Sequence, residues 1–179
     1  NTSATTVTDA VVRSAEDQPE GAWGLIAHEA AHQWFGDIVT CATWPHAWLN
    51  EGFATYFGSL YQRHAFGDAA FLHGYGGGLD GYLPACTGAN LRAIVKQEYR
   101  LPMDLFFDGT IYPGGASRLQ LLSGILGEER FRAGIALYLR RNAWHSVTTA
   151  AFEAAMSEAG GRDLRDWFAQ WVESPGYPV

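Results

Sequence analysis

Hydrophobic residues recur along much of the chain at the three- and four-residue intervals that are typical of amphipathic helices. In the clearest case, Leu164, Trp167, Phe168 and Trp171 form one apolar stripe, as in a helix that packs against a core. A short strand is expected around residues 4–8. The remaining periodicity predicts helices over residues 22–35, 48–63, 89–99, 113–126, 128–142 and 149–158. The pattern therefore indicates a mainly α-helical protein with at most a short β segment near its N-terminus.

One stretch shows neither the helical spacing nor the two-residue alternation of a strand. Residues 67–82 are rich in glycine and apolar side chains, and positions 76–81 (GGGLDG) formally match G-x-G-x-x-G. In dinucleotide-binding proteins that pattern follows a strand and opens a helix. No strand is predicted before it here, and no alternation of strands and helices surrounds it. We therefore exclude nucleotide binding.

Composition narrows the class of protein further. A chain of 179 residues with 47% hydrophobic residues is long enough to form one compact domain with its own core. A net charge of −7 argues against a nucleic-acid partner, and no apolar run approaches the ~20 residues that cross a bilayer. The two cysteines, Cys41 and Cys86, are compatible with a disulfide or with two buried thiols. We expect a single domain over residues 1–179 with no membrane span.

The segment His28-Glu29-Ala30-Ala31-His32 carries the strongest chemical signal. Residues four apart lie on one helical face, so His28 and His32 can bind a single cation. Glu29 lies about 100° around the helix and can reach a water beside that cation as a general base. Burying these side chains in an apolar helix is costly unless they are paired or bound to a metal. The alternative is a pair of histidines at the edge of the core.

Glu51 follows His32 after a gap of 18 residues. An acidic residue in the first turn of a helix is favoured by the helix dipole whatever its role. Together with the two histidines upstream, however, Glu51 completes a set of three ligands for one zinc ion per chain. His46 is a candidate partner for these ligands or a structural residue. His64, His73 and His145 lack the spacing of ligands.

Three segments together resemble the aminopeptidase N family of gluzincin metallopeptidases. Residues 28–37 (HEAAHQWFGD) and 48–54 (WLNEGFA) are similar to that family's two zinc motifs, including the gap between them. Residues 112–116 (YPGGA) resemble its Y-E-K-G-A segment, whose tyrosine stabilises the tetrahedral intermediate. Pro113-Gly114 stand where the family commonly has Glu-Lys. Residues 171–179 also resemble the end of the family's catalytic region.

The resemblance has consequences for the organisation of the protein. Residues 1–6 are similar to the segment that follows G-x-M-E in the family's exopeptidase motif, with Asn1 as its last residue. The chain would then be the helical part of a thermolysin-like catalytic domain, truncated at both ends relative to the family. The glutamate that binds the substrate's amino group and the flanking domains of the parent chain would lie outside it. With seven tryptophans, copies of such a fragment are expected to associate.

The resemblance implies zinc-dependent hydrolysis of N-terminal peptide bonds. His28, His32 and Glu51 would hold the metal, Glu29 would act as general base and then general acid, and Tyr112 would donate to the developing oxyanion. The substrate would be a peptide with a free N-terminus. The alternatives are an endopeptidase of the thermolysin type and a catalytically silent zinc-binding or scaffold fragment. By itself, the fragment is expected to be weakly active or inactive.

Overall fold

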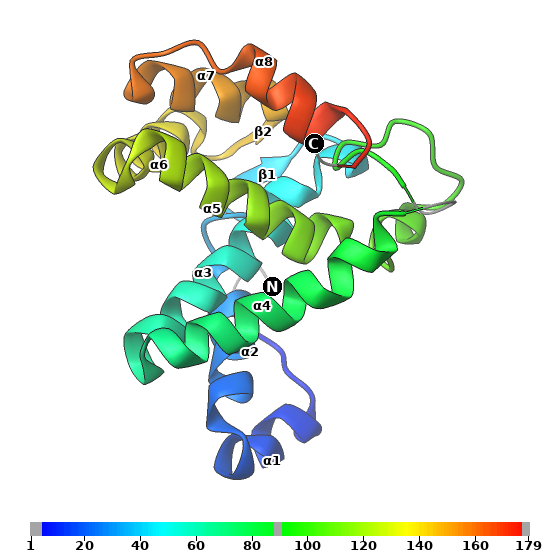
Figure 1. Ribbon diagram of the computed structural model, residues 1–179, viewed down its shortest axis with the longest axis vertical. Helices are drawn as coiled ribbons and strands as arrows, with labels where there is room; N and C mark the ends of the chain where they lie inside the picture. Colours follow the sequence, from blue (N-terminus) through cyan, green and yellow to red (C-terminus); the bar gives the residue numbers. More distant parts are fainter. Residues whose placement is uncertain (1–4, 88–90, 177–179) are drawn as a thin grey trace.

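The computed structural model describes residues 5–87 and 91–176, and helices make up most of it (Figure 1). The described part of the chain also contains two strands of three residues each. The expected mainly α-helical fold is confirmed. In chain order the main elements are α1 (Asp9–Asp17), α2 (Pro19–Ala31), β1 (Val39–Cys41), α3 (Trp48–Phe66), α4 (Asp68–Ala85), α5 (Gly115–Leu126), α6 (Glu128–Asn142), β2 (His145–Val147), α7 (Thr149–Gly160) and α8 (Arg165–Phe168). Short helical turns occur at η1 (Trp44–His46), η3 (Pro102–Leu105), η4 (Thr110–Gly114) and η5 (Ala169–Glu173).

The two strands join distant parts of the sequence. β1 and β2 run parallel, with Val39 opposite His145 and Cys41 opposite Val147. They connect the segment that follows α2 to the segment between α6 and α7. The sequence pattern predicted neither strand, because three residues are too few to establish a two-residue period. This pairing fixes the turn after α2 against the C-terminal helices.

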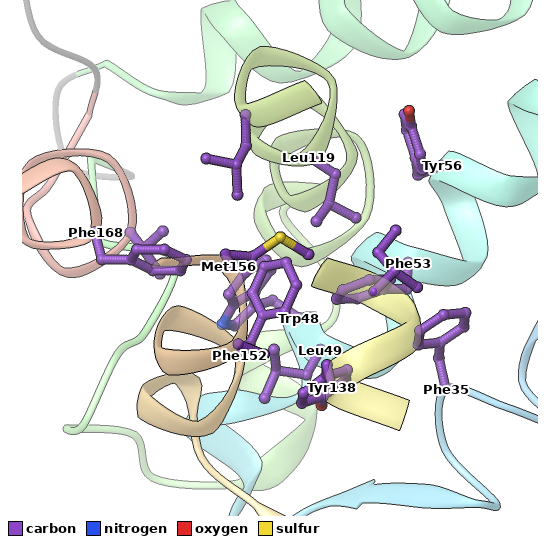
Figure 2. Packing of buried hydrophobic residues seen from close by; sticks show 14 of the residues in the cluster. Phe35, Trp48, Leu49, Phe53, Tyr56, Leu119, Tyr138, Phe152, Met156 and Phe168 are labelled. Atoms are coloured by element: carbon purple, nitrogen blue, oxygen red, sulfur yellow. The ribbon is translucent and has the colours of Figure 1, made fainter. Parts of the chain in front are cut away.

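An aromatic core lies beneath the first turns of α3. Figure 2 shows Trp48 and Phe53 of α3 beside Phe152 and Met156 of α7, and all four side chains are fully buried. The Trp48 indole N–H also donates to the Thr149 hydroxyl at 2.9 Å. Burying a large apolar side chain stabilises the fold by roughly 1.5–3 kcal/mol. The core therefore holds the N-terminal part of α3 in place, which is the part that carries Glu51.

Glycines allow α3 to approach its two neighbours closely. A Cβ added to Gly58 would lie 2.9 Å from the Gly24 carbonyl oxygen of α2. On another side of α3, a Cβ added to Gly52 would lie 2.9 Å from the Gly115 Cα of α5. Real Cβ atoms do not tolerate such distances, so both crossings depend on glycine. Gly52 follows Glu51 directly, and Gly58 lies six residues further along α3.

Two of the sequence-based predictions near loops are wrong. Residues 5–8 form no strand, and α1 begins directly after them at Asp9; position 4 lies outside the described residues. Residues 91–99 form no helix, and positions 89 and 90 are also outside the described part. The Arg92 guanidinium donates to the carbonyls of Ala93 and Leu105 and pairs with Asp108. These bonds stabilise a loop in place of the predicted helix.

The glycine-rich stretch is helical. It lies within α4, which packs against α3 and η4. Tertiary contacts here outweigh the low helix propensity of glycine. The G-x-G-x-x-G match falls inside the helix, away from the helix N-terminus at which phosphates bind. Among the described residues, no helix combines the length and the apolarity needed to cross a bilayer.

Candidate metal centre

Two histidines and one glutamate converge where the end of α2 meets the start of α3. His28 lies in the last turn of α2, and His32 is its C-cap residue. Their Nε2 atoms are 3.2 Å apart. Glu51 lies in the first turn of α3, and its Oε2 is 3.3 Å from each of these nitrogens. The three predicted ligand residues therefore meet at one point.

The spacing of these three atoms suits a zinc ion. Ligand atoms bound about 2.0 Å from a tetrahedral ion lie about 3.3 Å from one another. The observed separations are 3.2, 3.3 and 3.3 Å. Within the described part of the chain, this trio is the group of His, Cys, Asp or Glu whose ligand atoms gather closely enough to hold a metal. Two imidazoles and one carboxylate are also a ligand set of catalytic zinc sites.

The two histidines stabilise the ionised form of Glu51. Burial alone raises the pKa of Glu51, but hydrogen bonds from His28 and His32 outweigh burial and hold the pKa at about 2. Burial alone lowers the pKa of His32, whereas its hydrogen bond to Glu51 has the opposite effect and the net pKa is raised. Glu51 is therefore ionised at neutral pH, as a carboxylate ligand must be.

The second nitrogen of each histidine has a partner of its own. His32 Nδ1 lies 3.0 Å from the carbonyl oxygen of Phe35. Because a carbonyl can only accept, Nδ1 carries a proton, and in the neutral ring that a metal requires Nε2 has the free lone pair. His28 Nδ1 lies 3.4 Å from the hydroxyl of Thr55 on α3. Thr55 lies one turn after Glu51 on α3, and the structure places its hydroxyl beside His28.

Glu29 and Tyr112 face the same cavity as the three ligands. The cavity has a volume of about 660 Å³. Its lining consists of Leu25, His28, Glu29, His32, Gly36, Asp37, Asn50, Glu51, Thr55 and Tyr112. All five residues that the sequence singled out as the site therefore meet around one space. Leu25 and Asp37 were not predicted, although Leu25 precedes His28 by three residues and thus shares its helical face.

Tyr112 approaches the ligands from η4. Its ring stacks on that of His28, with the centroids 6.2 Å apart and the planes at 21°. Burial, with added effect from the negative charges of Glu51 and Glu29, raises the pKa of Tyr112 to about 12. The phenol is therefore protonated at neutral pH and able to donate a hydrogen bond.

The two residues after Tyr112 fit this turn. Pro113 lies inside the π-helical turn of η4, which follows Gly109 in a left-handed conformation with φ of 71°. A Cβ added to Gly114 would lie 2.9 Å from the Tyr82 ring. A larger residue at position 114, where the family commonly has lysine, would collide with that ring. Pro113-Gly114 is thus compatible with a tyrosine that faces the cavity.

His46 and the two cysteines lie outside the centre. His46 Nδ1 accepts the backbone N–H of Thr149 at 3.2 Å, so this histidine fixes the start of α7. Cys41 and Cys86 are free thiols, which removes the disulfide alternative. Cys41 Sγ accepts a long hydrogen bond of 3.7 Å from the Asn50 amide.

Comparison with known proteins agrees with this geometry. The profile of the peptidase family M1 domain matches residues 1–171. Aminopeptidase M1-B of Oryza sativa subsp. japonica is 32% identical over 178 residues, which cover 96% of this chain and 20% of that protein. Probable aminopeptidase 1 of Sulfurisphaera tokodaii is 34% identical over 163 residues, which cover 87% of this chain and 20% of that protein. The chain thus spans about a fifth of the length of these relatives.

A solved structure shares the fold. It is a mutant of the M1 zinc metallopeptidase of Deinococcus radiodurans bound to the substrate Tyr-Ser-Ala, with a TM-score of 0.71 and 28% identity. The match covers 87% of this chain and 34% of that one. A family profile that matches nearly the whole sequence, together with these relatives, shows that this chain belongs to peptidase family M1.

Proposed function

We propose that the protein containing this chain is a zinc-dependent aminopeptidase and that residues 1–179 are a single piece of its catalytic domain. The main support is the triangle of His28, His32 and Glu51 ligand atoms, whose separations of 3.2–3.3 Å suit one zinc ion. Glu29 and Tyr112 line the same cavity. A hydrolytic reaction needs a metal site, a base and an oxyanion donor in one place, and these five residues would supply all three.

Each residue of the site would have its own role in peptide hydrolysis. A zinc ion held by the three ligands supplies Lewis acidity and lowers the pKa of a water toward 7. Glu29 takes a proton from the attacking water and passes it to the leaving amine. Tyr112, which stays protonated with a pKa of about 12, donates a hydrogen bond to the oxyanion that develops on the scissile carbonyl.

Two observations favour a free N-terminus as the substrate's distinguishing feature. Three carboxylates, of Glu29, Asp37 and Glu51, line the cavity, whereas none of its described lining residues is a lysine or arginine. The three carboxylates outnumber the two positive charges of a bound zinc ion, so such a cavity still favours a cationic group, such as the α-ammonium of a peptide. The similar proteins of rice and Sulfurisphaera tokodaii are also named aminopeptidases.

The test uses the complete natural chain that carries these residues. An aminoacyl 4-nitroanilide and its N-acetylated counterpart are assayed, and the zinc content is measured for wild type, Glu29→Gln and Glu51→Gln. We expect the wild type to cleave only the free-amine substrate. Glu29→Gln should keep one zinc and lose at least ~10²–10⁴ in turnover, whereas Glu51→Gln should lose zinc.

Three other outcomes would contradict the proposed function or the proposed ligands. Equal cleavage of the acetylated substrate would favour an endopeptidase. Normal zinc content without Glu51 would contradict the ligand set. A wild type that holds zinc but cleaves neither substrate would favour a catalytically silent member of the family.

A further inference from the structure

We propose that Thr55 is a positioning residue that holds His28 in the orientation and tautomer that zinc requires. This inference rests on the proposed function, because it concerns the same metal centre. Thr55 binds neither the metal nor the reacting atoms in this scheme. It would act through His28.

Helix geometry brings Thr55 to His28. Glu51 and Thr55 are four residues apart on α3 and therefore lie on one face of that helix. The same face meets α2 at a close crossing, where a Cβ on Gly58 would lie 3.4 Å from the His28 Cβ. α3 thus supplies a ligand to the metal through Glu51 and, one turn later, a hydroxyl to a ligand on α2. This arrangement couples the two helices at the centre.

The contact distances determine which nitrogen of His28 has which role. His28 Nε2 is 3.3 Å from Glu51 Oε2 and 3.2 Å from His32 Nε2, so Nε2 faces the metal position. Nδ1 is the nitrogen near the Thr55 hydroxyl, at 3.4 Å. A metal-binding Nε2 must keep its lone pair, so Nδ1 must carry the proton. The Thr55 hydroxyl must then accept the hydrogen bond from Nδ1.

His32 provides an internal comparison. Its Nδ1 donates to the carbonyl oxygen of Phe35 at 3.0 Å, which is a backbone group and depends little on side-chain identity. The corresponding partner of His28 is a side chain. Partners of this kind typically change metal affinity or activity by 10–100-fold when they are removed. Since threonine also has a lower helix propensity than alanine or leucine, local helix formation does not explain its presence in the middle of α3.

The experiment measures zinc affinity rather than turnover. The complete natural chain is freed of metal and titrated with zinc in the presence of a competing chelator, which gives the zinc affinity. The visible absorption spectrum of the Co²⁺-substituted protein is recorded as a second measurement. Thr55→Val removes the hydroxyl and keeps the shape, whereas Thr55→Ser keeps the hydroxyl. Ser59→Ala is the matched control, because its hydroxyl lies one turn further along α3 and donates to the Thr55 carbonyl at 3.0 Å, away from His28.

We expect Thr55→Val to bind zinc about 10–100-fold more weakly and to alter the Co²⁺ spectrum. Thr55→Ser and Ser59→Ala should both bind zinc as the wild type does. Thermal unfolding of the metal-free proteins identifies a variant that fails to fold; if Thr55→Val does, Thr55→Ala takes its place.

Two results would overturn the inference. One is wild-type zinc affinity and an unchanged Co²⁺ spectrum in Thr55→Val. The other is an equal loss of affinity in Thr55→Val and Ser59→Ala, which would indicate a general effect on α3. Failure of the proposed function looks different, because the wild type itself would then bind no zinc or cleave no aminoacyl substrate.

Discussion

Tyr112 shows how single residues near the centre acquire chemical properties that their type alone does not determine. Its phenol is half-buried and stacks on His28, and the same surroundings raise its pKa to about 12. The four-residue spacing of His28 and His32 predicts a shared cation, because residues one helical turn apart lie on the same face. Glu51 was predicted as a ligand only in combination with these two histidines. Tyr112 could be predicted only through family resemblance, since 60 residues of chain separate it from Glu51. The contact of Thr55 with His28 could not be predicted from the sequence, because it depends on how α2 crosses α3.

We predict that Tyr112→Phe in the complete natural chain keeps one zinc and lowers kcat about 10²–10³-fold, as loss of one oxyanion donor typically does. KM should change little, because the hydrogen bond forms mainly in the transition state. Steady-state kinetics on an aminoacyl 4-nitroanilide, with metal analysis, provides the measurement. Tyr61→Phe, on a half-exposed tyrosine outside the site cavity, is the control. A Tyr112→Phe enzyme with unchanged kcat would remove Tyr112 from the reaction.

Asp108 stabilises the loop that leads into η4. Its Oδ1 accepts from Arg92 Nη2 at 2.9 Å and from the backbone N–H of Thr110 at 3.0 Å. Burial alone raises the pKa of Asp108, but the hydrogen bond from Arg92 outweighs burial and the net pKa lies below its ordinary value of 3.8. A lowered pKa in the folded state means that the ionised form stabilises the protein. That contribution is complete above pH 3.8 and is lost as the pH falls through the lower folded-state pKa.

We therefore predict that Asp108→Asn lowers the free energy of unfolding by about 2 kcal/mol at pH 7, because it leaves the Arg92 guanidinium without its charged partner. The difference between the two proteins should shrink as the pH falls below 3.8, where the wild-type carboxyl also becomes neutral. Urea unfolding of the metal-free proteins at pH 7, 4 and 3 tests this. A difference that stays constant across that range would show that the charge of Asp108 contributes nothing.

At the scale of elements, helices were predictable where the apolar stripe in the sequence is the side of the helix that packs against the core. This holds for α3, α5, α6 and α7, whose observed bounds agree closely with the predicted ranges. Leu91, Ile94 and Val95 have the same spacing, yet the Arg92 bonds and a backbone bond from Val95 to Val172 fix a loop there. α4 was missed for the opposite reason, because its contacts with α3 override its glycine content. Periodicity indicates which residues are buried. The backbone conformation of these residues is determined by their contacts with other elements.

The crossing of α2 and α3 gives a prediction about an element. Gly58→Ala would place a Cβ 2.9 Å from the Gly24 carbonyl oxygen, and the helices must separate to accommodate it. We expect weaker zinc binding by about 10-fold or more, because the separation moves His28 away from Glu51 and Thr55. Gly124→Ala, in α5 with open space around its Cβ, is the matched control and should stabilise the protein by up to about 1 kcal/mol. Unchanged zinc affinity in Gly58→Ala would show that this crossing tolerates movement.

At the scale of the whole molecule, the candidate metal centre and the core beneath it both lie within the described residues, and large apolar side chains are exposed elsewhere on the surface. On the side of α2 opposite the site, Trp23 and Trp34 are 44% and 51% exposed. They border an apolar cavity of about 570 Å³ between α2, α3 and α6. Apolar surface of this kind usually has a partner. The relatives are about five times longer than this chain, and we propose that flanking parts of the larger protein cover this surface.

We propose that the metal is bound locally by these residues and that groups elsewhere in the larger protein help to position the substrate, as the family resemblance implies. On this proposal the isolated 179 residues should fold, bind one zinc and hydrolyse aminoacyl 4-nitroanilides on the order of 10²-fold or more slowly than the complete chain, because loss of positioning groups lowers turnover as well as affinity. Exposed Trp23 and Trp34 should also make the isolated chain associate with itself at high concentration, which light scattering detects. Glu51→Gln in the same isolated chain is the control for specific zinc binding. Turnover close to that of the complete chain would mean that these residues contain all that catalysis needs.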